Sequence, residues 1–526
     1  MPTLNDRLKV NVSPNRRGRH WLVPLVLLIV LIAAVFFGIL FVRRNAEPIL
    51  RARIIESLST RFDSRVELGE FYGDLGNGIL IQGGALKLYP RNIAWDKPLF
   101  AVRRFAFRTS WSQLLHTSIH IEHVDVEGLE INLPPKDQRK KVPQLSSFRN
   151  TFSISVKEIE IKNAYLTLGT SRPGKVPLDF DIRYLVLNTN AENQPLKFRA
   201  TLVNPKPVGD IASTGYFGPF DSGNPGDSNV HGSYEFSHAD LSTIKGIGGI
   251  LSSRGQYSGT LNQITVDGYT DTPDFRISIS GHPVPLHTTF HAIVDGTNGN
   301  TFLDPVDALL LRSHILARGR VVRAQDRSGH HITLDVVVDK ARIEDLLRLG
   351  VRTNPPVMTG AVHLRTKLDL PPGDLPVHQK LRLNGRFLIE GAHFTNPATQ
   401  KKIDSLSLRG QGKPKEAIDD IPDNVLSRMG GNFTLRNSRI TLEGLQYNVP
   451  GLQVNMEGVY SLDGNEFNFR GKARLDAKLS HMTTGWKSLL LKPVDPFFSR
   501  NGAGTELPIK ITGTRSEPRF GLDFSH

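Results

Sequence analysis

The sequence predicts a mainly β protein, in which one transmembrane helix near the N-terminus is followed by a long, antiparallel, repetitive sheet with a few short helices. Three observations predict it. Residues 21–42 (WLVPLVLLIVLIAAVFFGILFV) carry no charge. Much of the chain after residue 79 alternates apolar and polar side chains, which is the pattern of half-buried strands. The 47 glycines and 33 prolines suit the many turns of such a sheet.

Segment 21–42 predicts the membrane helix. At about 1.5 Å per residue it would span roughly 33 Å, which is enough for a bilayer core. Arg43 and Arg44 follow directly, where a cleaved signal peptide would have small residues, so an uncleaved anchor is the better interpretation. Five basic residues lie before the segment and six between it and residue 65, so the positive-inside rule does not decide the orientation.

The segments that follow are predicted from their periodicity. Residues 47–62 repeat apolar side chains at helical spacing and predict a short amphipathic helix that packs on the sheet or lies on the membrane surface. Alternating runs then predict strands within 79–89, 105–111, 118–133, 147–168, 178–187, 433–449, 452–462 and 467–479. Short helices or loops are expected within 239–253, 341–349 and 415–429.

These segments suggest a division of the chain into regions. A basic tail at 1–20 and the membrane helix at 21–42 precede a first β region at 43–135, which begins with the amphipathic helix. A charged linker bounded by prolines follows at 136–150. A middle β region at 151–300 and a C-terminal β region at 301–526 complete the chain.

The chain lacks the familiar patterns of catalytic and metal-binding proteins. GQGKP (410–414) ends in proline where a phosphate-binding loop needs Ser or Thr, and no G-x-S-x-G elbow occurs. With no cysteine, thiolate chemistry is excluded. His120 and Glu122 should share one face of a strand and His123 the other, which leaves too few ligands for zinc. We expect no catalytic residue, no cofactor and no metal, and hence no enzyme.

The charge distribution argues against nucleic-acid binding. The formal net charge is +14, and half of it lies in residues 1–65, which hold 11 Lys and Arg against 4 Asp and Glu. Basic residues that flank a membrane helix ordinarily contact lipid phosphates, whereas a nucleic-acid protein would carry them with aromatic residues on its folded body.

The chain resembles the AsmA family of envelope proteins, which includes AsmA-, TamB- and YhdP-like members. The resemblance lies in the order of a basic tail, a membrane helix and ILRARIIESLSTRF, and then in three phrases of the body, SISVKEIEIKNAYLTL, GQYSGTLNQITVDGYTDTPDFRISI and GNFTLRNSRITLEGLQYNVPGLQVNMEGVYSL. The ending, LPIKITGTRSEPRFGLDF, is similar to the last strand pair of the family, with a turn at 514–518 and with Ile509, Ile511, Phe520 and Leu522 on one apolar face.

This resemblance implies a fold, a location and a role. The implied fold is a groove-forming sheet, a β-taco related to chorein-type lipid-transfer proteins. The implied location is the cell inner membrane, with the N-terminus in the cytoplasm and the body in the periplasm. The implied role is lipid transport between membranes, or lipid homeostasis and protein assembly in outer-membrane biogenesis.

Candidate groove residues are the apolar positions that keep phase on the clearest strands. They are Ile154, Val156, Ile159, Ile161, Leu178, Phe180, Ile182, Phe433, Leu435, Leu445, Tyr447, Ile509 and Ile511. Period two cannot distinguish lipid from protein as the neighbour, so each could equally belong to an ordinary sandwich core. A bulge is expected between Val156 and Ile159, where the phase shifts by one residue.

Two functions from different classes remain open at this stage. In the first, the protein binds or moves phospholipid, with acyl chains in the groove, the inner membrane as a partner and other envelope lipid-transport components as further partners. In the second, it assists the assembly of outer-membrane proteins by strand addition at sheet edges. A membrane-bound hydrolase would need a cluster of polar residues that the sequence does not offer.

Overall fold

The computed structural model describes most of the chain after residue 64. Its described residues are 55, 59, 64–74, 79–90, 97–109, 118–133, 153–168, 178–188, 194–218, 225–296, 298–324, 329–419, 425–464, 466–482, 504–514 and 518–523. The predicted membrane helix at 21–42, most of the amphipathic helix at 47–62 and the linker at 136–150 lie outside them. Among the described residues, no helix has the length and hydropathy to cross a bilayer.

The described part consists mostly of strands, as the alternating runs predict. They are β1 (Ser64–Glu67), β2 (Phe71–Asp74), β3 (Ile79–Pro90), β4 (Phe100–Thr109), β5 (Ser118–Leu133), β6 (Ser153–Leu168), β7 (Leu178–Asn188), β8 (Leu196–Pro205), β9 (Val208–Phe217), β10 (Asn229–Asp240), β11 (Ile247–Gly248), β12 (Ile250–Thr260), β13 (Gln263–Ile277), β14 (Val284–Asp295), β15 (Asn300–Leu310), β16 (Ser313–Arg323), β17 (His330–Arg342), β18 (Met358–Leu370), β19 (Arg382–Phe394), β20 (Arg428–Arg436), β21 (Arg439–Val449), β22 (Leu452–Ser461), β23 (Phe467–Leu475), β24 (Thr505–Gly513) and β25 (Pro518–Leu522).

Short helices interrupt the strands at a few places. They are η3 (Pro225–Asp227), η4 (Leu241–Thr243), α3 (Ile343–Gly350), α4 (Val377–Lys380), α5 (Pro397–Gly410), α6 (Glu416–Asp419) and η5 (Leu479–Met482). The helix expected within 341–349 is therefore confirmed as α3. Of 239–253, only the three residues of η4 are helical, and β11 and β12 begin inside it.

Local chemistry explains where the two longest helices begin. Asn396 caps α5, since its side chain accepts a hydrogen bond from the backbone N–H of Thr399 at 3.1 Å, and Pro397 supplies a preset first turn. In α3, Glu344 and Asp345 lie in the first turn and Arg348 in the last, which complements the helix dipole.

The 25 strands form one sheet in which neighbours in the chain are nearly always neighbours in space. From β3 to β25 each strand pairs with the next, antiparallel in every case but β5–β6, except that the two-residue β11 pairs with β13, while β10 pairs with β12. β1 and β2 both lie along the outer edge of β3. Among the described strands, the one parallel pair is β5–β6, whose connection runs through the expected linker. At about 4.8 Å per strand, the sheet extends on the order of 100 Å.

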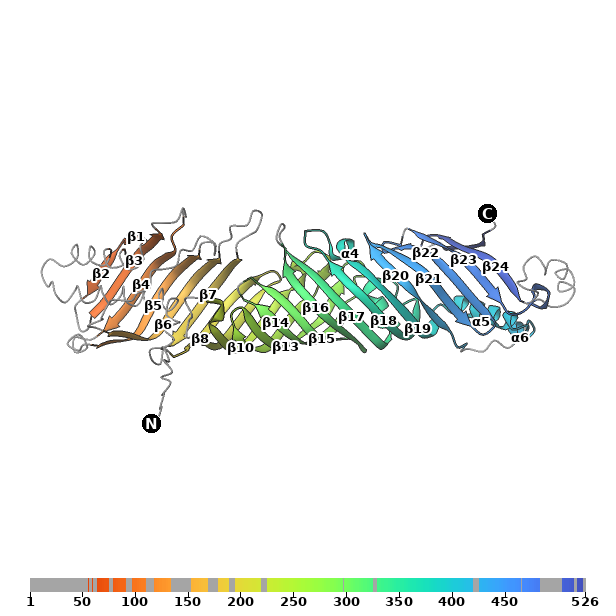
Figure 1. The fold of residues 1–526 in the computed structure, drawn as a ribbon, viewed down its shortest axis with the longest axis horizontal. Coiled ribbons are helices and arrows are strands. Elements are labelled where there is room, and N and C mark those ends of the chain that lie inside the picture. Colours follow the sequence, from red (N-terminus) through yellow and green to blue (C-terminus); the bar gives the residue numbers. More distant parts are fainter. Residues whose placement is uncertain are drawn as a thin grey trace, which may run out of the picture.

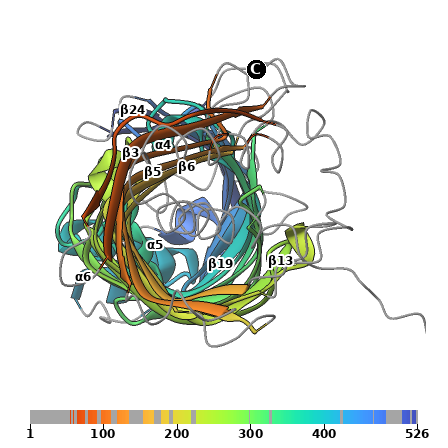
Figure 2. The ribbon, with the colours of Figure 1, turned by 90° about the vertical axis from the view of Figure 1, so that its left-hand side faces the viewer.

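Figure 1 shows this elongated sheet, with strands inclined to its long axis and the order of the chain preserved from β1 to β24. Viewed along the axis in Figure 2, the strands curve around an interior and leave the cross-section open on one side. The twist between neighbouring strands accumulates over so many strands, so a long sheet curls and does not stay flat.

Most fully buried apolar residues gather in two clusters, one toward each end of the sheet, while others such as Val284, Ala292 and Leu310 lie between them. The N-terminal cluster comprises Val66, Leu68, Phe71, Leu86, Leu88, Val102, Phe105, Phe107, Ile121, Val124, Val126, Leu129, Ile159, Ile161 and Ala164. The C-terminal cluster comprises Val338, Ala341, Met358, Val362, Ile389, Ala392, Tyr447, Val449, Leu452, Ala473, Leu475 and Met482. Among the described residues, β8–β15 contribute to neither cluster.

The last two strands correspond to the strand pair predicted at the end of the sequence. β24 and β25 pair so that Ile509 lies opposite Leu522 and Ile511 opposite Phe520. The shared face predicted for these four residues is therefore confirmed by the backbone register. The strands predicted within 433–449 are confirmed as the end of β20 and the whole of β21, and Asn437 and Ser438, with positive φ angles of 51° and 60°, turn the chain between them.

Candidate functional site

The candidate site is one face of the sheet, which is defined by a row of residues that lie opposite one another on successive strands. The pairing carries this row, the central row, without a break from β2 to β25. Its members are Phe71, Gly83, Phe105, Val126, Ile161, Leu185, Ala200, Ser213, Tyr234, Gly255, Gly268, Phe290, Val306, Ala317, Val336, Thr366, Gly385, Phe433, Leu442, Gly458, Phe469, Ile511 and Phe520.

The central row contains no charged residue. The residues next to it along each strand point to the opposite face and are rich in charge, among them Arg104, Glu127, Lys162, Glu235, Arg254, Asp307, Arg365, Arg386, Glu443, Arg470 and Lys510. Of these, Arg104 and Glu127 form an ion pair across β4 and β5, and Glu235 and Arg254 form one across β10 and β12. The sheet therefore has one apolar and one charged face along its whole length.

The two faces also differ in exposure. Every central-row residue whose burial is described is buried or half-buried. By contrast, the opposite face includes exposed apolar side chains, such as Val337 at 37% and Leu316 at 38%. Central-row residues are thus less exposed to solvent than these residues of the opposite face, also where no second layer of secondary structure covers the sheet.

Contacts with α5 identify the apolar face as the concave one. Ile403 of α5 packs against the C-terminal cluster, which includes Leu452 and Leu475 on the same face as the central row. Figure 2 places α5 on the inner side of the curved sheet. The central row consequently runs along the inside of the curve.

Helices cover only one margin of this concave face. Ile343, Leu346 and Leu347 of α3 pack on the C-terminal cluster, as does Ile403 of α5. Asp345, which is 3% exposed, fixes α3 by accepting hydrogen bonds from the hydroxyl of Ser313 at 2.8 Å and the N–H of Arg312 at 3.2 Å. Over β8–β15 the described helices make fewer contacts, among them those of α3 with β13.

The middle of the concave face is lined by aromatic rings that lie over glycines. A Cβ at Gly255 would lie 2.8 Å from a ring carbon of Tyr234, and one at Gly268 would lie 2.8 Å from the hydroxyl of Tyr234. The missing side chains allow the ring to lie close to the backbone of the sheet.

Hydroxyl groups on these strands are paired with one another. The hydroxyls of Tyr257 and Ser213 lie 2.7 Å apart, and those of Tyr234 and Ser253 lie 3.1 Å apart. Burial raises the pKa of Tyr234 and of Tyr257, although these hydrogen bonds act in the opposite direction. Both tyrosines stay neutral, so this part of the face carries no charge.

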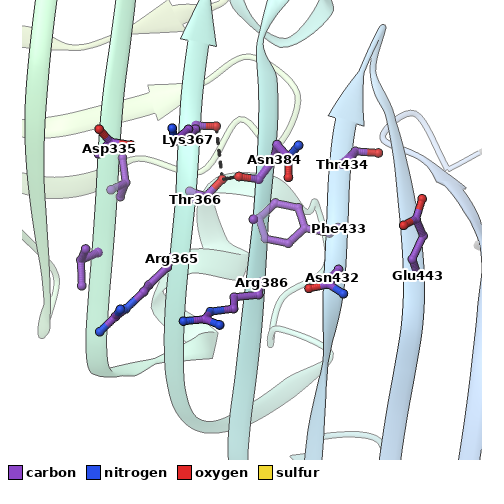
Figure 3. Close-up of a pocket in the computed structure, with 13 residues that line it drawn as sticks. Asp335, Arg365, Thr366, Lys367, Asn384, Arg386, Asn432, Phe433, Thr434 and Glu443 are labelled. Carbon is purple, nitrogen blue, oxygen red and sulfur yellow. Dashed lines mark hydrogen bonds between the residues drawn. The ribbon is translucent and has the colours of Figure 1, made fainter.

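A hollow of about 610 Å³ lies over β17–β21. Figure 3 shows its lining, in which Thr366 and Phe433 of the central row alternate with charged neighbours such as Arg365 and Arg386. The hydroxyl of Thr366 donates to the carbonyl of Asn384 at 3.1 Å, which satisfies it within the sheet. Gly385 lies in the central row between Thr366 and Phe433, its partners on β18 and β20, and a Cβ there would lie 2.6 Å from the Cβ of Thr366.

The structure places the candidate groove residues in three overlapping groups. Ile161, Phe433 and Ile511 belong to the central row. Ile159 and Ile161 are 0% and 1% exposed and belong to the N-terminal cluster, against which Ile182 packs. Leu435 is 4% exposed and Tyr447 is 9% exposed, whereas Phe433, Leu445, Ile509 and Ile511 are half-buried.

The positions of the other four candidates are given only by the backbone pairing of their strands. Their side chains lie outside the described set, but the backbone pairs Ile154 with Ile119, Val156 with Ile121, Leu178 with Leu168, and Phe180 with Leu166. Near the bulge expected between Val156 and Ile159, the partner strand β5 changes phase, since Ile121 and Val124 are both buried although they are three residues apart.

Tyr447 has protein neighbours on more than one side. Its ring meets Phe394 edge-on with 6.2 Å between centroids, and burial raises the pKa of its hydroxyl to about 12. Tyr447 and Ile159 thus pack against protein, and the half-buried residues of the central row are the better candidates for contact with a ligand.

Sequence reasoning missed the middle of the concave face. Tyr234 and Tyr257 lie on β10 and β12, where glycines and serines such as Gly232, Ser253 and Gly255 share their face, so the apolar alternation of these strands is weak. A count that treated glycine and alanine as members of the inner face would have found them.

Comparisons with protein-family models, with curated proteins and with solved structures gave no match to this chain.

Proposed function

We propose that the protein binds phospholipid by its acyl chains along the concave face and moves it between membranes. The observation that carries this proposal is the central row, which stays uncharged from β2 to β25 and is buried or half-buried wherever its burial is described. An enzyme would need convergent polar groups on this face, whereas a lipid needs only a continuous apolar surface.

Energetic considerations favour acyl chains as the layer that covers the apolar face of the sheet where the protein does not. A sheet with one apolar face needs a second layer, and the described helices supply one only along a margin of the C-terminal half. Each buried methylene is worth about 0.8 kcal/mol relative to water. Since a bilayer offers equally apolar surroundings, moving a chain from membrane to groove is nearly balanced, which suits a protein that must release its cargo.

The dimensions fit as well. The stretch from β8 to β15, which contributes to neither buried cluster, is roughly 30 Å wide at about 4.8 Å per strand. One leaflet of a bilayer core is about 15 Å thick, so this stretch accommodates extended acyl chains. Head groups would stay in water on the open side of the curve.

The location follows from the sequence and from the resemblance to the AsmA family. Residues 21–42 would anchor the chain in the inner membrane, and the sheet would extend into the periplasm as a β-taco. At a length on the order of 100 Å the sheet itself supports movement over a distance far greater than one lipid.

The first test is lipid analysis of the full chain extracted in mild detergent. We expect mass spectrometry to find co-purifying phospholipid and the protein to speed the exchange of labelled lipid between vesicles. Protein that is folded, carries no amphiphile and leaves exchange at the uncatalysed rate would contradict the proposal. If such protein still assembled outer-membrane barrels, the alternative of strand addition at β25 would take its place.

A further inference from the structure

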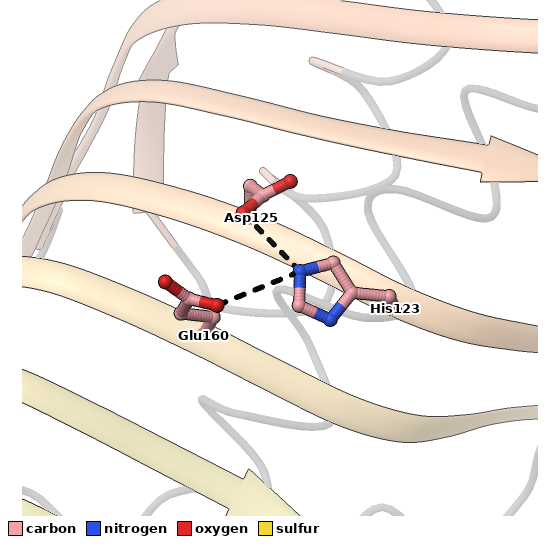
Figure 4. A group of neighbouring side chains, drawn as sticks. All are labelled: His123, Asp125 and Glu160. Carbon is pink, nitrogen blue, oxygen red and sulfur yellow. Dashed lines mark hydrogen bonds and ion pairs between the residues drawn. The ribbon is translucent and has the colours of Figure 1, made fainter.

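The parallel pair β5–β6 carries a compact group of metal-ligating side chains on its outer side. His123 and Asp125 come from β5, and Glu158 and Glu160 come from β6. The register places Glu158 opposite His123 and Glu160 opposite Asp125, so the four residues form the corners of a square. Figure 4 shows the carboxylates of Asp125 and Glu160 pointing toward one ring nitrogen of His123.

The distances assign different roles to the two nitrogens of His123. Nδ1 lies 3.0 Å from Oε1 of Glu158, a hydrogen-bond distance. Nε2 lies 3.2 Å from Oδ1 of Asp125 and 3.9 Å from Oε2 of Glu160. If Nδ1–H donates to Glu158, Nε2 faces two carboxylates, an arrangement that is stabilised by a positive charge between them, supplied either by a proton on Nε2 or by a metal ion.

The spacing matches that of ligands on one metal ion. Two ligand atoms about 2.1 Å from a tetrahedral zinc ion lie about 3.4 Å apart, a value between the two Nε2–oxygen distances. A ligating histidine usually donates its other N–H to a carboxylate, which is the role open to Glu158. The ligand atoms of His123, Asp125 and Glu160 all lie within 4.8 Å of one another.

Several other histidine–carboxylate pairs on this sheet are simpler, although His363 also meets two carboxylates, Asp339 at 2.6 Å from Nδ1 and Glu390 at 3.8 Å from Nε2. Nδ1 of His291 lies 2.7 Å from Asp267, and Nδ1 of His287 lies 2.7 Å from Asp271, which are ordinary short hydrogen bonds to a single carboxylate. Around His123 three carboxylates gather, and Lys162, whose ammonium lies 2.8 Å from the other oxygen of Glu160, forms an ion pair with one of them. Lys157 is paired with Glu122 instead.

We propose that His123, Asp125 and Glu160 bind a divalent transition-metal ion such as zinc, with Glu158 orienting the imidazole and water completing the coordination. The ion links β5 to β6, the one parallel pair among the described strands, and so clamps the first strands to the rest of the sheet. The inference is independent of lipid binding.

Sequence reasoning could not find this site. It tested His120, Glu122 and His123 within one strand, and the side chain of His120 lies outside the described set. The partners of His123 come from its own face two residues on and from a strand that begins 20 residues after β5 ends. No spacing within β5 indicates Glu160.

The test is equilibrium dialysis of the purified full chain against zinc chloride, with His123→Ala as the variant. Because the chain has 17 histidines, the control is His291→Ala, which removes an ordinary histidine–aspartate pair. We expect His123→Ala to weaken the tightest site at least about tenfold and His291→Ala to leave it unchanged. Zinc should also raise the melting temperature of the wild type and of His291→Ala, but not of His123→Ala.

Two results would overturn the proposal. One is equal zinc affinity of the wild type and His123→Ala, and the other is no bound zinc in the wild type at about 0.1 mM free ion, far above the range of built sites. Should His123→Ala fail to fold, Asp125→Asn combined with Glu160→Gln keeps the shape of the cluster and removes its charge. Unchanged binding in that variant contradicts the proposal equally.

Discussion

Replacing Val336 by glutamate is expected to remove bound phospholipid, while the same replacement at Val337 leaves it in place. The two valines are neighbours on β17 and face opposite sides of the sheet. Val336 is a half-buried member of the central row, and Val337 is 37% exposed beside Arg365 on the charged face. A carboxylate at position 336 would lie against acyl chains, where an unpaired charge costs several kcal/mol.

The measurement is the ratio of phospholipid to protein after mild extraction. Val336→Glu should lower it at least about tenfold, since 1.4 kcal/mol already corresponds to a factor of ten. Circular dichroism and the melting temperature show whether both variants keep the fold. Equal lipid content in two folded variants would mean that the faces do not differ in what they bind.

Replacing Gly268 by leucine is expected to obstruct the groove at its middle. A Cβ there would lie 2.8 Å from the hydroxyl of Tyr234, 2.9 Å from the ring of Phe290 and 2.8 Å from the carbonyl oxygen of Arg254. The two rings can move only toward the concave side, so they would rise from the floor into the space for lipid. Overpacking of this kind costs about 1–3 kcal/mol of stability.

Vesicle exchange separates this obstruction from simple loss of binding. Because the two rings and the leucine would fill the cross-section, we expect Gly268→Leu to lower the exchange rate at least about tenfold. Lipid bound on either side of the obstruction should remain. Thr289→Leu is the control, because Thr289 is exposed on the neighbouring strand and faces outward. Exchange at the wild-type rate in folded Gly268→Leu would exclude passage along the central row.

The elements that could be predicted from sequence are those with strong, local patterns. The run 118–133 matches β5, and the runs at 79–89 and 178–187 lie within one residue of β3 and β7. An antiparallel meander brings neighbours in the chain together, so the alternation of each strand and the turn that follows it nearly determine the sheet. This explains why Ile509, Ile511, Phe520 and Leu522 could be placed on one face.

Features that depend on distant partners could not be predicted. The parallel pairing of β5 with β6 depends on the path of residues 134–152, for which no local rule exists. Glu160 beside His123 follows from that pairing. The central row in the middle of the sheet uses Gly255 and Gly268 as inner residues, and glycine carries no apolar signal although it shapes the floor.

The sequence also could not predict how far each apolar residue is covered by other parts of the protein. Ile159 and Phe433 look alike as in-phase apolar residues, yet Ile159 is 0% exposed in the N-terminal cluster and Phe433 is half-buried beside Gly385. The alternation of apolar and polar residues determines on which face of the sheet a residue lies. The helices and the curvature of the sheet determine which groups lie against that face.

Photo-cross-linking along β15 tests the central claim most directly. The chain has no cysteine, so a single introduced cysteine carries a photoreactive group at one known position. The register turns Thr301, Leu303, Val306 and Ala308 toward the concave face and Phe302 and Asp307 away from it. We expect phospholipid to cross-link from the first four positions and not from the other two, with the alternation changing phase between Leu303 and Val306. Equal yields from both faces, or no lipid adduct at any position, would contradict the account.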